Sequence, residues 1–146
     1  MFIHATTVAF KSTGGSWRAA LLRGPSGSGK SDLALRALEA GGRLVADDQT
    51  HVARKGRGLI ATPPAALAGM IEVRGLGIVR LGRMKLLSRA AVGLLVDLVP
   101  ADRIDRLPEA RHEALLGVDL PVLALAPFEA SAAAKLRLAL ARTARA

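Results

Sequence analysis

The stretch WRAALLRGPSGSGKSDLAL, residues 17–35, constrains the fold of this chain more than any other segment. An apolar strand pattern over residues 17–23 leads into a glycine-rich segment, and a helical pattern follows from about residue 30 to residue 40. The form G-x-x-x-x-G-K-[ST] between a strand and a helix lets backbone N–H groups surround phosphate oxygens at the positive end of the helix. We therefore predict an α/β fold built around a phosphate-binding loop.

The length and composition are those of one globular domain, which we predict to cover residues 1–146. Half of the residues are apolar (51%), but they form short runs, well below the roughly 18 consecutive residues of a membrane-spanning helix. The first ten residues lack the pattern of a signal peptide, and the absence of cysteine excludes disulfides and thiolate metal sites. We expect a soluble cytoplasmic protein that does not bind a membrane.

Strands outnumber helices in the predicted order of elements. Only one strand–loop–helix unit is clear, so a mixed sheet is expected rather than a purely parallel one. The predicted helices cover residues 30–40 and 128–146, the second with Phe128, Ala132, Leu136 and Leu140 on one face. The predicted strands and turns are strands 2–9, 17–23 and 43–48, a hairpin over 50–61, a helical turn at 62–69, a glycine-interrupted strand 71–81, and strands 91–99 and 118–127.

The net charge of +9, from 21 basic and 12 acidic residues, favours anionic partners such as nucleotide phosphates, nucleic acid or an acidic protein. A composition rich in Ala, Arg and Leu can produce the same charge without any binding site. Aromatic residues for stacking on exposed bases are scarce, with one Trp, three Phe and no Tyr. A nucleic-acid-binding role is therefore disfavoured.

The predicted phosphate-binding loop provides both backbone and side-chain ligands. Lys30 is expected to reach the β- and γ-phosphates of a nucleotide, and the Ser31 hydroxyl to ligate Mg²⁺. The residues assigned to nucleotide binding are Gly24, Pro25, Ser26, Gly27, Ser28, Gly29, Lys30 and Ser31.

Two acidic positions compete for the catalytic chemistry. Asp97 ends an apolar strand, which is the pattern of a Walker B metal ligand. The pair Asp47-Asp48 ends the strand that follows the phosphate-loop helix and offers a carboxylate able to accept a proton from a hydroxyl. A strand-end turn with capping carboxylates would also explain the pair.

A third group of residues favours the pair. Glu72 and Arg74 are two residues apart, so they would share one face of a strand, and Gly75-Leu76-Gly77 follows directly. A carboxylate for a metal, a guanidinium for phosphate and a glycine nest for anions would form the second half of a phosphoryl-transfer site. Alone, the stretch also fits an exposed strand with a glycine bulge.

Four motifs in order resemble the catalytic domain of HPr kinase/phosphorylase, the bacterial enzyme that phosphorylates a serine of the phosphocarrier protein HPr. They are IHAT, GPSGSGKSDLAL, RLVADD and IEVRGLGI, and the resemblance covers roughly residues 2–100. It implies a phosphate-loop core shared with PEP carboxykinase, ATP and Mg²⁺ as cofactors, and an HPr-like carrier of the phosphotransferase system as partner. It also implies regulation of carbohydrate metabolism, a homo-oligomer (usually a hexamer) and a short form without the N-terminal domain.

The resemblance also implies residue roles. Lys30 and the loop backbone would bind the nucleotide phosphates, and Ser31 with Glu72 would hold Mg²⁺. Asp48 stands eighteen residues after Lys30, at the position of the family's proton-transferring aspartate.

Three further residues are assigned to catalysis by the resemblance. Asp47 lies beside the proton-transferring aspartate, and His4 matches the family's histidine near the phosphates. Arg74 would stabilise the transferred charge. An ordinary strand histidine is the alternative interpretation of His4.

The chain departs from the family pattern late in its sequence. The family places a loop of the form P-V-[RK]-x-G-R-N there, whereas this chain has VDLPVLALAPFEASAAAKL, with no arginine before Arg137. The family resemblance thus implies the kinase reaction more strongly than the phosphorylase reaction. Two other functions stay open: a small-molecule kinase or NTPase that uses Asp97, and a basic ATP-binding regulator without transfer activity.

Overall fold

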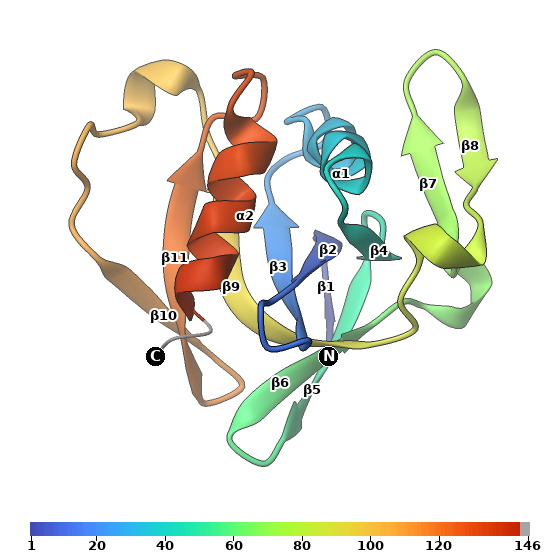
Figure 1. Ribbon diagram of the computed structural model, residues 1–146, viewed down its shortest axis with the longest axis horizontal. Helices are drawn as coiled ribbons and strands as arrows, with labels where there is room; N and C mark the ends of the chain where they lie inside the picture. Colours follow the sequence, from blue (N-terminus) through green and yellow to red (C-terminus); the bar gives the residue numbers. More distant parts are fainter. Residues whose placement is uncertain (144–146) are drawn as a thin grey trace.

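A computed structural model describes residues 1–143, which fold into a curled mixed sheet with two α-helices on one face (Figure 1). Seven of the nine strands of the main sheet lie in the order β1-β5-β6-β9-β3-β2-β4, and the other two, the β10–β11 hairpin, join it through β11, which pairs with β9. The elements are β1 (Phe2–Ile3), β2 (Thr6–Lys11), β3 (Trp17–Arg23), α1 (Lys30–Glu39), β4 (Arg43–Ala46), β5 (Thr50–Lys55), β6 (Gly58–Thr62), β7 (Met70–Val73), β8 (Gly77–Arg80), β9 (Ala90–Leu98), β10 (Arg111–Leu115), β11 (Val118–Leu125) and α2 (Ala132–Thr143).

The strand that leads to the phosphate-binding loop belongs to a parallel group of three strands, and the strands beside this group are antiparallel to it. β3 runs parallel to β9, and β9 runs parallel to β11. β2 pairs antiparallel with both β3 and β4, and β6 pairs antiparallel with the start of β9. The prediction of a mixed α/β fold is therefore confirmed.

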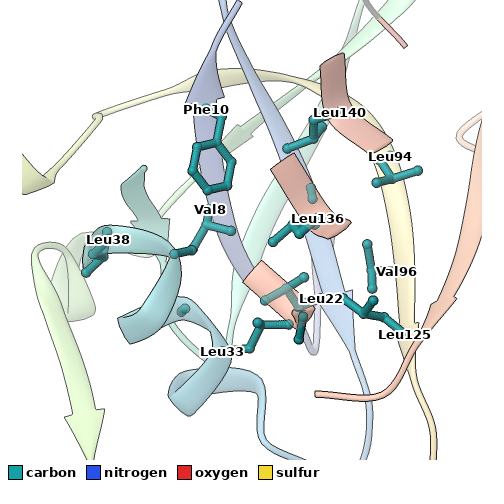
Figure 2. Close-up of a cluster of buried hydrophobic side chains, with 14 of the residues drawn as sticks. Val8, Phe10, Leu22, Leu33, Leu38, Leu94, Val96, Leu125, Leu136 and Leu140 are labelled. Atoms are coloured by element: carbon teal, nitrogen blue, oxygen red, sulfur yellow. The ribbon is translucent and has the colours of Figure 1, made fainter. Parts of the chain in front are cut away.

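The core on the helix side of the sheet fixes both helices (Figure 2). In α1 the spacing of Leu33, Ala34, Ala37 and Leu38 puts a continuous apolar stripe against the sheet. α2 contributes Ala132, Leu136 and Leu140 at the same helical spacing. The sheet packs against both helices through alternate residues of its strands, namely Val8, Phe10, Ala20, Leu22, Leu94, Val96 and Leu98.

The intervening residues of the same strands form a second core on the opposite face. Ala9, Leu21 and Leu95 point away from the helices and pack against side chains of the β5–β6 hairpin and of β11. Central strands with two buried faces explain why β3 and β9 read as continuous apolar runs rather than as alternating patterns.

Two predicted elements differ from the structure near the site. Residues 71–81 do not form one strand, because Gly75 and Gly77 adopt positive φ angles of 91° and 93° and turn the chain into the β7–β8 hairpin. Arg74 consequently lies in the turn. The prediction that it shares a strand face with Glu72 is therefore wrong.

Two further differences concern the C-terminal third. The predicted helix 128–146 begins only at Ala132, Phe128 lies outside it and is exposed, and residues 144–146 are outside the described part. β10 was not predicted, because an edge strand with no buried residue carries no apolar periodicity.

Arg23, the last residue of β3, ties three strands together where the phosphate-binding loop starts. Its Nε donates to Oδ1 of Asp97 on β9 (2.8 Å). Its two terminal nitrogens donate to Glu113 on β10, at 2.6 Å and 3.0 Å. The hydrogen bonds from Arg23 are the main cause that holds the pKa of Glu113 below its usual value of 4.5, and partial burial opposes them.

We expect the change Leu136→Ala to lower the free energy of unfolding by about 2–5 kcal/mol, because it removes a fully buried side chain from between the sheet and α2. Leu138→Ala in the same helix is the matched control. That leucine is 66% exposed, so its loss should change stability by less than about 0.5 kcal/mol. Urea unfolding of both variants makes the measurement, and equal effects would contradict the packing of α2 described here.

The Arg23–Glu113 pair predicts a specific pH dependence of stability. Because folding lowers the pKa of Glu113, its ionised form stabilises the native state above the unfolded value, and this contribution is lost as the pH falls through the folded value. Glu113→Gln should therefore be less stable than the wild type near neutral pH, and the difference should shrink as the pH falls below 4.5, the usual pKa of this carboxyl. Urea midpoints across this range test it, with Glu109→Gln, an exposed neighbour, as control. A difference that persisted at low pH would contradict the ionic contribution.

Candidate active site

The loop between β3 and α1 has the backbone shape of an anion cradle. Gly29 precedes the first residue of α1 with φ of +97°, and the N–H of Ser28 donates to the carbonyl of Pro25 (3.0 Å). A Cβ added to Gly29 would also lie 2.9 Å from Cζ of Phe128. Gly29 is thus required by the backbone angle and by the neighbouring ring.

Lys30 is buried at the centre of this loop. Its Nζ donates to the carbonyl oxygens of Gly24 (2.7 Å) and Pro25 (3.1 Å), so the side chain folds back over the loop that precedes it. Two of its three N–H donors are used in this way. The ammonium group is therefore held against the loop backbone at Gly24 and Pro25, where it can meet a bound polyphosphate.

Asp47 is the hydrogen-bonding hub of the site. Its Oδ1 accepts from the hydroxyls of Ser31 (2.7 Å) and Thr6 (3.0 Å), and its Oδ2 accepts from the backbone N–H of Glu72 (2.9 Å). One half-buried carboxylate therefore joins the end of β4 to the start of α1, to β2 and to β7. The sequence analysis assigned Asp47 to catalysis as part of the Asp47-Asp48 pair, and no local pattern indicates the contacts that it makes.

Asp48 points to a different place from Asp47. Its φ of +66° is uncommon for a residue with a Cβ, and its backbone N–H donates to Oγ1 of Thr6 (3.0 Å). The carboxylate is exposed, and its Oδ1 accepts a hydrogen bond from Nε2 of His4 (2.7 Å). The left-handed backbone is what separates the two carboxylates, one directed to Ser31 and one to the mouth of the site.

A cavity of about 450 Å³ lies between the phosphate-binding loop, Asp48 and the β7–β8 hairpin, and it has the size of a small-ligand site. It is bounded by the phosphate-binding loop, the first turn of α1, Asp48 and Phe128, and on the hairpin side by Glu72, Val73 and Arg74. Arg74 reaches this cavity from the β7–β8 turn rather than from a strand. The predicted residues His4 and Asp47 contact its walls, through Asp48 and Ser31 respectively.

The donor set fits Mg²⁺ held jointly with a polyphosphate. Residues 1–143 contain no cluster of three or more His, Cys, Asp or Glu side chains able to hold a metal ion alone. Mg²⁺ is usually bound by one or two carboxylates together with substrate phosphates and water. The Ser31 hydroxyl and the Glu72 carboxylate provide oxygen donors of this kind beside the loop.

Asp97, the competing candidate, is engaged elsewhere. Its Oδ1 accepts from Arg23 at 2.8 Å, and Nη2 of Arg111 lies 3.9 Å from its Oδ2. Asp97 does not border the cavity.

Phe128 is the cavity residue that the sequence assigned wrongly. It was expected on the buried face of a helix, but its side chain is 71% exposed and its ring lies against Gly29. The serine at position 131, a residue type favoured at the N-cap, is the signal that could have placed the helix start at Ala132.

Comparisons with known proteins agree with the fold. Residues 4–143 match the family model of the HPr serine kinase C-terminal domain. The HPr kinase/phosphorylase of Chlorobaculum tepidum is 38% identical over 118 residues, covering 74% of this chain and 34% of the relative. That of Geobacillus thermodenitrificans is 34% identical over 114 residues, covering 72% and 37%. The chain thus spans about a third of the length of these relatives.

The fold is also found in a solved structure. The HPr(Ser) kinase/phosphatase of Coxiella burnetii superposes with a TM-score of 0.78 at 23% identity, over 99% of this chain and 94% of the other. In residues 1–143, no helix is both long and apolar enough to cross a membrane. The family match over nearly the whole chain confirms the resemblance predicted from the four motifs, and the chain belongs to the HPr serine kinase C-terminal domain family.

Proposed function

We propose that this chain is a Mg-ATP-dependent protein serine kinase that phosphorylates HPr or an HPr-like phosphocarrier. The observation that carries the proposal is that two adjacent carboxylates point to different parts of the site. Asp47 is directed to Ser31 at the loop, and Asp48 pairs with His4 at the exposed mouth. A phosphate site and a proton acceptor therefore border one cavity, as transfer from a nucleotide to a hydroxyl requires.

In the proposed reaction, Asp48 accepts the proton of the target serine as its oxygen attacks the γ-phosphorus. His4 orients that carboxylate through its hydrogen bond. Lys30 and the loop N–H groups stabilise the negative charge on the transferred phosphoryl group, and Arg74 contacts it from the hairpin side. The bond between the γ-phosphorus and the bridging oxygen breaks, and ADP leaves.

Ser31 and Glu72 would hold Mg²⁺, and Asp47 would orient the Ser31 hydroxyl toward it. The metal, when bound, neutralises charge on the β- and γ-phosphate oxygens. Asp47 acts here as a positioning residue, because it touches Ser31 and the Glu72 backbone rather than the reacting atoms.

The exposed mouth suits a protein substrate. His4, Asp48 and Arg74 are all exposed, so a serine on a folded partner can reach the proton acceptor. The net charge of +9 would draw an acidic carrier toward this surface. We propose the kinase direction only, because the stretch VDLPVLALAPFEASAAAKL stands where the family has its late arginine loop. We also propose a cytoplasmic location and a homo-oligomer, as the family resemblance implies.

We expect Asp48→Asn to slow phosphate transfer from labelled ATP to purified HPr by about 10²–10⁴-fold, because it removes the proton acceptor. Nucleotide binding should be retained. Lys30→Ala should abolish transfer and weaken ATP binding as well, because it removes the central cation of the loop. Asp119→Asn, an exposed aspartate of β11, is the control. ATP binding without transfer to any carrier would contradict the kinase and favour an ATP-binding regulator.

The metal assignment gives a second test. In the presence of ADP, Asp47→Asn should weaken Mn²⁺ binding, measured by electron paramagnetic resonance, by about 10–100-fold, because Ser31 loses the group that orients it. Asp97→Asn should leave Mn²⁺ binding unchanged. The reverse result would favour a small-molecule kinase or NTPase with Asp97 as its metal ligand.

A further inference from the structure

We infer that Phe128 is the platform on which the base of the nucleotide stacks. The inference rests on the proposed function, since it takes the phosphate-binding loop to hold a nucleotide. It adds a residue that contacts the base, the part of the nucleotide that the phosphate-binding loop does not recognise.

The ring is exposed although the chain uses few aromatic residues. Phe128 is one of only three phenylalanines, and 71% of its surface is accessible. One edge of the ring lies against Gly29, where an added Cβ would meet Cζ at 2.9 Å and Cε1 at 3.1 Å. An apolar ring beside a phosphate cradle, and on the border of the same cavity, offers a π-face next to the place where the phosphates would lie.

The position in the fold also suits a base. Phe128 follows β11, and β3, β9 and β11 are parallel, so the loops after their carboxyl ends share one edge of the sheet. Ligands of open α/β sheets bind in the crevice at this edge. In Figure 1 the segment before α2 lies on one side of α1 and the β7–β8 hairpin on the other.

The chemistry of the site fixes the direction of the nucleotide. The γ-phosphate must lie near Asp48 and Glu72, where the proton acceptor and the metal ligand are. The base, at the other end of the molecule, must then extend away from the hairpin. Phe128 is the aromatic residue that borders the cavity, and the segment before α2 that carries it lies across α1 from the hairpin (Figure 1).

The segment that carries Phe128 is held by hydrogen bonds to the residues immediately before and after it in the sequence. From α1, the guanidinium of Arg36 donates to the carbonyl of Pro127 and, at 3.2 Å, to that of Glu129. Asp32 holds the same guanidinium, accepting from its Nε at 3.1 Å. Pro127 is buried, and its Cβ faces Gly29 beside the ring. A platform fixed before binding loses little freedom when a base stacks on it.

The test compares ATP with inorganic tripolyphosphate, which has the phosphates but no base, by titration calorimetry. Phe128→Ala should weaken ATP binding by about 5–100-fold, the range expected for one stacked base, and change tripolyphosphate binding by less than about twofold. Phe128→Trp should keep ATP affinity, because the indole also stacks. Phe2→Ala, at another exposed phenylalanine, is the control and should alter neither.

Several outcomes would overturn the inference. If Phe128→Ala weakened both ligands equally, the ring would support the loop rather than the base. If ATP binding were unchanged or stronger, the ring would be no platform, while the proposed nucleotide binding would stand. If the wild type bound neither ligand, the proposed function itself would fail, and the inference with it.

Discussion

The carboxylate of Asp47 is the interaction on which the rest of the site depends. It accepts three hydrogen bonds, from Ser31 at the start of α1, from Thr6 on β2 and from the backbone of Glu72 on β7. These segments are far apart in sequence, and the apolar packing that also joins them is not directional. A half-buried carboxylate with its lone pairs satisfied fixes their relative positions and places the metal-side residues beside the phosphate-binding loop.

The same constraint explains the unusual backbone of Asp48. With Asp47 directed inward, an extended residue 48 would continue the strand, whereas the φ of +66° turns its carboxylate to the mouth of the site beside His4. Thr6 stabilises this conformation, because its hydroxyl contacts both Asp47 and the N–H of Asp48. Strain of this kind persists only where the surroundings hold it, and here a single buried threonine does so.

The sequence predicted what depends on local pattern. The phosphate-binding loop, α1 and the β5–β6 hairpin follow from glycine spacing and periodicity, which neighbouring residues determine. The β7–β8 hairpin was predicted as one strand, because two glycines fit either a bulge or a turn. The links of Arg23 to Asp97 and Glu113 could not be predicted, since they join residues 74 and 90 positions apart.

Those links engage two carboxylates near the carboxyl end of β3. Arg23 binds Asp97 on β9 and Glu113 on β10, whereas Asp47 is the half-buried carboxylate bound to Ser31. The segment after β11 is held by Arg36 through two backbone carbonyls, a contact that does not involve the side chain of residue 128. A position whose backbone is fixed in this way can carry different side chains without disturbing the fold, which is the freedom that a specificity-determining residue requires.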